Sequence, residues 1–212
     1  MNIAVIGATG STGLEFVRQA LEKGHNITAL VRTPARMTVQ HENLHMVQGD
    51  VYNAEDVARV VAGQDAIFIS LGTGANAIKT TIREDGTRIV LDVLQESGET
   101  PFLLVMSSLG VNESMKQVYL FWPVILNPLL GNAFKDHAEQ EKLVRASGLP
   151  HLILRPTNLS DAPGMGSITA SPPPKHAPVL PSVARADVVA YALDALENQH
   201  TAPEAIALTK AR

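Results

Sequence analysis

The chain has no cysteine among its 212 residues, which excludes disulfides, thiol nucleophiles and cysteine-ligated zinc. It also lacks a cluster of lysine and arginine, and its formal charge is −4, which argues against a nucleic-acid partner. Long apolar runs are missing as well. The longest, residues 118–130, is too short to cross a bilayer and is interrupted by Pro123, Asn127 and Pro128. The sequence therefore predicts neither a nucleic-acid nor a membrane partner.

The sequence predicts neither a targeting signal nor a linker that would divide the chain. The first predicted strand begins at residue 2 or 3, which leaves no room for a signal or transit peptide, so we expect a cytoplasmic protein. Hydrophobic residues make up 45% of the chain and charged residues 18%, as in ordinary globular domains. We expect a single domain over residues 1–212, without a metal site, as a monomer or weak homodimer.

Three glycines at three-residue spacing follow the first apolar run, Ile3–Ile6. Gly7 allows a sharp turn as the strand ends, Gly10 leaves space for a pyrophosphate, and Gly13 lets the next helix pack close to the sheet. The helix N-terminus then directs free N–H groups at the phosphates. This context predicts a dinucleotide-binding turn, with a tight turn that holds no ligand as the alternative. Short polar side chains in the same turn are Thr9, Ser11 and Thr12.

The second predicted strand, Ile27–Val31, ends in arginine, where NAD-binding proteins usually have Asp or Glu for the ribose 2′-hydroxyl. A guanidinium group suits a 2′-phosphate and gains little from a bare hydroxyl. Arg32 and Arg36 therefore predict NADP(H) as the cofactor. The alternative is that both are ordinary surface arginines.

Strand and helix patterns alternate along the whole chain, which predicts an α/β fold. We expect a doubly wound, Rossmann-like parallel sheet with a small C-terminal cap over the substrate, formed by the proline-rich loop at Ser171–Pro178. The further strands are predicted at His45–Gln48, Ala66–Ser70, Phe102–Met106, His151–Leu154 and Ala205–Leu208. The helices are predicted near Leu14–Leu21, Asn53–Val61, Arg83–Gln95, Ala133–Ala146 and Arg185–Glu197.

Ligands of such sheets bind beyond the carboxyl ends of the strands, so the residues at those ends are candidate contacts. Asp50 is placed to accept from the adenine amino group, and Gly72 lets the backbone pass close to the ribose and phosphates. Ser107 and Ser108 would border the nicotinamide. The alternative for each is a loop residue that only closes the sheet. The remaining candidates at these ends are Val51, Leu71, Thr73, Pro156, Thr157 and Asn158.

The tyrosine and lysine pair by which common short-chain dehydrogenases donate a proton is missing. Tyr52, Tyr119 and Tyr191 are followed four residues later by Asp56, Pro123 and Ala195. Alcohol and ketone chemistry by that route is therefore disfavoured. An acceptor with a conjugated system takes a hydride without a strong acid at one oxygen, which favours a flavin or a linear tetrapyrrole as the small-molecule substrate.

Two other segments leave alternatives open. The aromatic run at 118–130 is either a lid, pocket wall or oligomer contact, or a packed helix of the core. His137 falls in a predicted helix, where a packed or phosphate-facing role is expected, and Asp136 and Glu139 beside it are expected on the solvated face.

Taken together, several motifs resemble the atypical short-chain dehydrogenases of the NAD(P)H-binding, NmrA-like group, and within it the biliverdin reductase B (flavin reductase) family. The motifs are Gly7–Gly13, Leu30–Arg32, Gly49–Val51, Gly63–Asp65, Leu71–Thr73, Ser107–Ser108 and Ala146–Leu149 followed by Arg155–Pro156. The resemblance implies a reductase that transfers hydride from NADPH to flavins or open tetrapyrroles. It also implies a cofactor contact from His137 and places Ser108 beside the nicotinamide, as the candidate catalytic residue.

Two other functions fit parts of the pattern. A non-catalytic, NADP-binding regulator that senses redox state would keep the nucleotide turn and would not need the missing tyrosine and lysine. An epimerase that uses bound nucleotide would need an acid and base pair, which the sequence does not provide.

Overall fold

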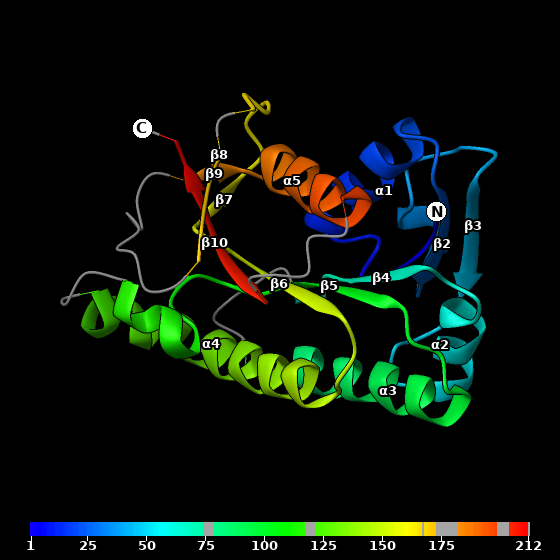
Figure 1. The fold of residues 1–212 in the computed structure, drawn as a ribbon, viewed down its shortest axis with the longest axis horizontal. Coiled ribbons are helices and arrows are strands. Elements are labelled where there is room, and N and C mark those ends of the chain that lie inside the picture. The colour runs from blue at the N-terminus through cyan, green and yellow to red at the C-terminus, as the bar shows by residue number, and fades with distance from the viewer. Residues whose placement is uncertain (74–78, 118–121, 167, 173–181, 199–203, 212) are drawn as a thin grey trace.

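One eight-stranded sheet organises the chain, with strand order β3-β2-β1-β4-β5-β6-β10-β8 (Figure 1). The computed structural model describes residues 1–73, 79–117, 122–166, 168–172, 182–198 and 204–211, without the side chains of 117 and 122–130. Seven strands run parallel, as the alternating pattern predicts. They are β1 (Asn2–Ile6), β2 (Asn26–Val31), β3 (Leu44–Gln48), β4 (Ala66–Ile69), β5 (Phe102–Met106), β6 (His151–Pro156) and β10 (Ala205–Lys210).

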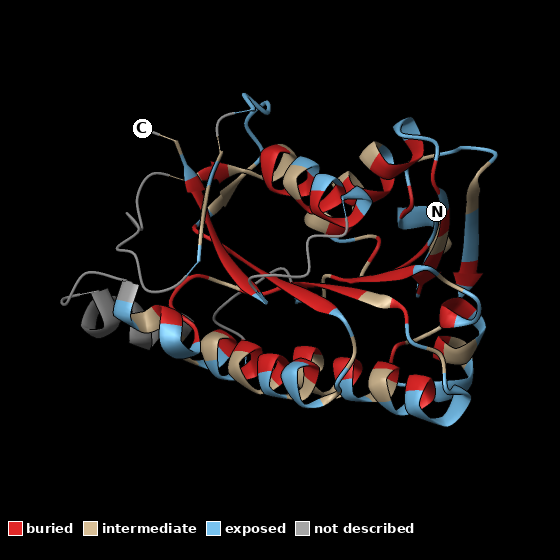
Figure 2. Cartoon of the chain, viewed as in Figure 1, coloured by how far each residue is buried: buried red, intermediate tan, exposed pale blue. Residues whose placement is uncertain are grey.

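Helices cover both faces of this sheet, so the doubly wound Rossmann-like fold is confirmed (Figures 1 and 2). On one face lie α1 (Ser11–Glu22) and α5 (Arg185–Glu197); on the other lie α2 (Ala54–Val61), α3 (Ile82–Ser97) and α4 (Trp122–Ala146). The central strands β1 and β4 are buried on both sides and carry almost only apolar residues, as strands between two helix layers must. Phe16 of α1 stacks on Phe68 of β4, with ring centroids 4.0 Å apart.

The sheet is not wholly parallel, which corrects the expected architecture. Strand β8 (Ile168–Ser171) runs antiparallel to β10 at the edge of the sheet. A second, two-stranded sheet pairs β7 (Leu159–Ser160) with β9 (Val183–Ala184). These strands were missed because they have two to four residues, too few to show an alternating pattern. Most of the proline-rich loop expected to form a cap, namely its residues 173–178, lies outside the described residues.

Helix α4 begins at Trp122, eleven residues before the expected start at Ala133. A packed helix was one of the alternatives for this segment, which two prolines interrupt. Pro123 lies in the first turn, where a missing N–H costs nothing. Pro128 removes only one hydrogen bond from a 25-residue helix, which packs along α3. The helical part of the aromatic run is therefore an extension of α4, while residues 118–121 lie outside the described ones.

The strand order reverses direction between β1 and β4, because the chain builds the sheet outward to β3 and then returns to add β4 and β5. At such a point the two connections leave in opposite directions and open a crevice beyond the carboxyl ends of the strands. The fold therefore places the Gly7–Gly13 turn, which follows β1, at the crevice expected for a ligand.

Candidate functional site

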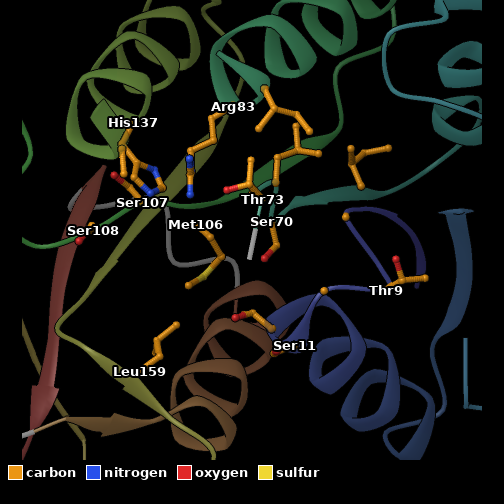
Figure 3. Close-up of a pocket in the computed structure, with 18 of the residues that line it drawn as sticks. Thr9, Ser11, Ser70, Thr73, Arg83, Met106, Ser107, Ser108, His137 and Leu159 are labelled. Atoms are coloured by element: carbon orange, nitrogen blue, oxygen red, sulfur yellow. The ribbon is translucent and has the colours of Figure 1, made fainter. Parts of the chain in front are cut away.

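A groove of about 780 Å³ lies along the carboxyl ends of the strands, within the size range of cofactor sites. Its lining joins segments that are far apart in the sequence, from the turn after β1 to the segment after β6 (Figure 3). All eighteen candidate residues line it. They are Gly7, Thr9, Gly10, Ser11, Thr12, Arg32, Arg36, Asp50, Val51, Leu71, Gly72, Thr73, Ser107, Ser108, His137, Pro156, Thr157 and Asn158.

The three glycines of the first turn differ in what a side chain would meet. Gly7 has φ +93°, and a Cβ there would collide with the carbonyl oxygen of Ser70. A Cβ on Gly13 would collide with the carbonyl oxygen of Gly7, so helix α1 can pack this closely only with glycine. A Cβ on Gly10 would meet the protein only at 3.4 Å, from the Gly7 oxygen. The protein itself thus requires Gly7 and Gly13, whereas Gly10 keeps space open in the groove.

The N-terminus of α1 faces this space. The first intrahelical bond is donated by Leu14 to the carbonyl oxygen of Gly10 at 2.8 Å, so the N–H groups of residues 11 to 13 precede the ladder. No side chain among the described residues caps this end, and the first turn has no acidic residue. The helix end is therefore open to an anionic ligand, which its dipole would stabilise.

The charges that line the groove are mostly positive. In the described part of the chain, four arginines line it, Arg32, Arg36, Arg83 and Arg185, against one acidic residue, Asp50. Arg32 and Arg36 are exposed and follow β2, so both lie at the end of the groove where a dinucleotide would place its adenosine. A polyanion with several phosphates fits this balance of charge.

Asp50 stabilises the turn after β3. Its carboxylate accepts a hydrogen bond from the Tyr52 N–H at 3.1 Å, and its own N–H donates to the Asp56 carboxylate at 2.9 Å. The contact expected from Asp50 to the adenine amino group remains a prediction, and the side chain lines the correct end of the groove for it.

Ser107 is bonded away from the groove. Its hydroxyl donates to Glu141 Oε1 at 2.6 Å, and both side chains are buried. The same carboxylate accepts two bonds from the buried Arg155, from Nε at 2.9 Å and from Nη2 at 2.6 Å. Arg155 also contacts Glu113 at 2.8 Å. This buried ion network fixes the end of β5, so Ser107 is expected to contact the cofactor through its backbone.

Ser108, in contrast, is partly exposed to the groove (Figure 3). Its hydroxyl donates only a long hydrogen bond, 3.3 Å, to the carbonyl oxygen of Leu109. Because a bond of this length is weak, the hydroxyl can turn to a ligand at small cost. Ser108 therefore remains the candidate catalytic residue.

A cluster of Arg83, Asp136 and His137 forms the wall between α3 and α4 (Figure 3 shows Arg83 beside His137). The expectation that Asp136 lies on a solvated face was wrong, since its side chain is only 1% exposed. Its carboxylate accepts from the N–H of Glu84 at 2.9 Å and from Arg83 Nη1 at 3.1 Å. Asp136 therefore caps α3 and holds the Arg83 side chain. Glu139 pairs with Lys142 at the surface, as expected.

His137 is buried and held neutral. Desolvation, with repulsion from the Arg83 guanidinium, lowers the pKa of its imidazole to about 3, against a partial counter-effect from its contact with Gln140. His137 therefore stays uncharged at neutral pH and is not a general acid there. It is buried and also lines the groove, so the cofactor contact implied by the resemblance stays a prediction.

The pKa of His137 predicts how stability changes in acid. In the unfolded chain the imidazole of His137 is protonated with a pKa of about 6.5, whereas in the folded protein its pKa is about 3. Stability from this group is complete above pH 6.5 and falls by about 1.4 kcal/mol for each pH unit below it. We expect His137→Gln to lose stability less steeply than the wild type between pH 6.5 and 5 in denaturant titrations. Equal slopes would contradict this pKa.

Arg83 and Arg185 line the groove and were not among the residues predicted from the sequence. Each lies in the first turn of a helix, α3 or α5, where the dipole disfavours a positive charge. An arginine in the first turn of a predicted helix was therefore the sequence signal that could have identified both residues as candidate ligand contacts. Arg185 pairs with the exposed Asp161 at 3.1 Å, while its Nε and Nη1 are buried without a partner among the described residues.

The described residues contain no helix long and apolar enough to cross a membrane. They also contain no cluster of three or more His, Cys, Asp or Glu side chains that could hold a metal ion.

The chain matches the model of a known protein family, described as NAD(P)H-binding, over residues 7–199. The chain belongs to this family. A chloroplastic protein of Arabidopsis thaliana is 31% identical over 182 residues, which cover 80% of this chain. The chain spans about three fifths of the length of that relative, and of an oxidoreductase of Aspergillus parasiticus. Membership in an NAD(P)H-binding family agrees with the glycine turn and the basic groove.

Solved structures share the fold of this NAD(P)H-binding chain. A short-chain dehydrogenase of Veillonella parvula, in complex with NADP, superposes with a TM-score of 0.81 at 17% identity over 99% of this chain and 94% of its own. An anaerobilin reductase of Escherichia coli O157:H7 gives 0.79 at 20%, over 99% and 97%. A putative NADH-flavin reductase of Streptococcus pneumoniae gives 0.77 at 21%, over 99% of both chains.

Proposed function

We propose that this protein is an NADPH-dependent reductase that transfers a hydride to a flavin or a linear tetrapyrrole. The observation that carries the proposal is the groove itself: a glycine turn and an open helix end at its centre, arginines at the adenosine end and Ser108 at the other. Reductases of such acceptors occur among the structural neighbours, one titled an anaerobilin reductase and one a putative NADH-flavin reductase.

The residues along the groove fit only one orientation of the cofactor. Arg32 and Arg36 would hold the 2′-phosphate, the N-terminus of α1 the pyrophosphate, and the segments after β4 and β5 the nicotinamide half. When bound, NADPH supplies a hydride. Side chains of Met106, Leu109, Phe134 and Leu159 give the other end an apolar wall, suited to a planar conjugated acceptor. Figure 3 shows two of them, Met106 and Leu159.

The protein's own contribution would be orientation and exclusion of water. Ser108 is the polar group placed to hold the nicotinamide carboxamide or the acceptor, and to relay a proton from water. Neither Tyr52 nor Tyr191 lines the groove, and His137 is neutral, so the described residues offer no strong acid there. An acceptor that needs no such acid fits best.

Steady-state oxidation of NADPH, followed by its absorbance with FMN or biliverdin and without an acceptor, tests the proposal. We expect turnover that depends on the acceptor and is slowed in Ser108→Ala. Tight NADPH binding without turnover on either acceptor would contradict it. That outcome would favour the second candidate, a redox-sensing regulator, which the missing tyrosine and lysine pair also permits.

Cofactor preference gives a second prediction. Arg32→Ala should weaken NADPH by about tenfold to 100-fold, because one or two charge-assisted hydrogen bonds to the 2′-phosphate are lost. NADH lacks this phosphate, so its affinity should change by less than about threefold. Calorimetric titration of both nucleotides measures the two effects, with Arg59→Ala, an exposed arginine away from the groove, as the control. Equal losses for both nucleotides would show that Arg32 does not recognise the 2′-phosphate.

A further inference from the structure

Among the described residues that line the groove, Arg83 is the one charged residue that is nine-tenths buried, with a side chain only 9% exposed. Its Nη1 donates to Asp136 at 3.1 Å. Its Nε is buried and has no hydrogen-bond partner among the described residues. Its Nη2 lies 3.3 Å from the position that a Cβ on Gly72 would take. Within the described part of the chain the guanidinium thus has one hydrogen-bond partner, Asp136, and its Nη2 lies at the groove near the end of β4.

Other acidic side chains nearby are engaged elsewhere. Glu84 pairs with Arg88 at 2.7 Å, and Asp85 accepts from the Thr81 hydroxyl at 2.6 Å. The Asp136 carboxylate accepts a hydrogen bond from the Arg83 guanidinium and two more from backbone N–H groups at the N-terminus of α3. His137, which lies beside Arg83 in Figure 3, is neutral. The Arg83–Asp136 pair carries no net formal charge, but Arg83 lines the groove whereas Asp136, Glu84 and Asp85 do not, so the side of the pair that faces the groove is positive.

The topology places this charge near the nicotinamide half of the cofactor. Strands β2, β1, β4 and β5 lie side by side in that order. With the 2′-phosphate at the end of β2 and the pyrophosphate at α1, which follows β1, the chain of the dinucleotide continues over β4 and β5. Arg83 lies against the end of β4 and beside His137, near Ser107 and Ser108 at the end of β5 (Figure 3).

We propose that Arg83 makes this site prefer the reduced cofactor over the oxidised one. The proposal deepens the proposed function and rests on it. The nicotinamide ring is neutral in NADPH and positive in NADP⁺, while the phosphates of the two are the same. A fixed cation in a partly buried site repels only the oxidised ring.

The same charge acts on both partners of the hydride transfer. The hydride leaves C4 of the dihydronicotinamide with two electrons, so the cofactor is oxidised and becomes one charge more positive. The acceptor forms a bond to that hydrogen, is reduced, and becomes one charge more negative until water supplies a proton. A guanidinium beside the pair disfavours the positive nicotinamide and stabilises the negative acceptor, so its two effects on the transfer step oppose each other. Arg83 is therefore a specificity-determining residue in binding, where it favours release of the oxidised cofactor after the transfer.

The ratio of the dissociation constants for NADP⁺ and NADPH isolates this effect, since contributions from the phosphates cancel. It is measured without an acceptor, by fluorescence titration of NADPH and competition by NADP⁺. We expect the wild type to bind NADPH about tenfold or more tightly than NADP⁺, Arg83→Gln to lower the ratio at least about fivefold, and Arg83→Lys to retain most of it. Asp136→Asn removes the countercharge and should raise the ratio.

Arg32→Ala is the matched control, because it removes a groove arginine at the phosphate end and should weaken both nucleotides with an unchanged ratio. Equal wild-type affinities for NADP⁺ and NADPH would overturn the proposal, even if Arg83→Gln fails to fold. An unchanged ratio in a folded Arg83→Gln protein would overturn it as well. Failure of the proposed function looks different: the ratio would be as expected, but neither FMN nor biliverdin would be reduced.

Discussion

Arg155→Met is expected to lower the free energy of unfolding by about 3–5 kcal/mol. Arg155 is completely buried at the end of β6, and it is the cation that balances Glu141, which is equally buried. Its removal leaves that carboxylate in the interior, where the cost of an unpaired charge is large. Because Glu141 also accepts the Ser107 hydroxyl, the end of β5 should loosen, and turnover should fall together with stability.

Two further variants separate this effect from a general loss of surface charge. Arg145 contacts the same Glu113 at 2.9 Å but is a third exposed, so Arg145→Met should cost only about 1 kcal/mol or less. Replacing Arg155 and Glu141 together by apolar residues of similar size should recover much of the loss, since no charge then remains unpaired. Denaturant titration measures all three. A loss in Arg155→Met no larger than in Arg145→Met would contradict the role of this network.

The second large effect is expected at Gly10, and it concerns binding. Gly10→Ser should leave the fold intact, because a Cβ there has room and serine is a favourable residue at the start of a helix. The new side chain would occupy the space kept for the pyrophosphate and would bond the N–H groups that bind it. We expect NADPH affinity to fall at least about 100-fold, from the loss of two or more charge-assisted hydrogen bonds.

Gly13→Ser provides the contrast, three residues away in the same turn. Its Cβ would collide with the carbonyl oxygen of Gly7, so this variant should lose several kcal/mol of stability, on the order of an overpacked core substitution. Unfolding curves and NADPH titrations of the two variants should thus show opposite patterns. Full NADPH affinity in Gly10→Ser would mean that the pyrophosphate does not bind at this turn.

The residues at strand ends were predictable, because parallel strands bring all their carboxyl ends to one edge of the sheet. Gly7, Arg32, Asp50, Gly72 and Ser108 each follow a different strand, and they meet in one groove. Once apolar runs identify the strands and the alternation with helices shows that the strands are parallel, the position of each residue follows from the fold.

What the sequence did not reveal depends on partners distant in the chain. From the residues around it in the sequence, Asp136 is expected on the exposed face of a helix. Only the packing of α4 against the start of α3 shows that it binds Arg83. Likewise, the hydroxyl of Ser107 is engaged by Glu141, 34 residues later. Pairings of this kind leave no periodic pattern, and strands as short as β7 and β9 leave none either.

The central claim is that this groove binds a phosphorylated dinucleotide through its glycine turn and its arginines. Calorimetric titration of the purified chain with NADPH and NADH tests it most directly. We expect one NADPH per chain, bound at least about tenfold more tightly than NADH, with the difference shrinking as salt screens the 2′-phosphate. The absence of any binding heat and of any thermal shift with either nucleotide would contradict the account, whatever acceptor is then tried.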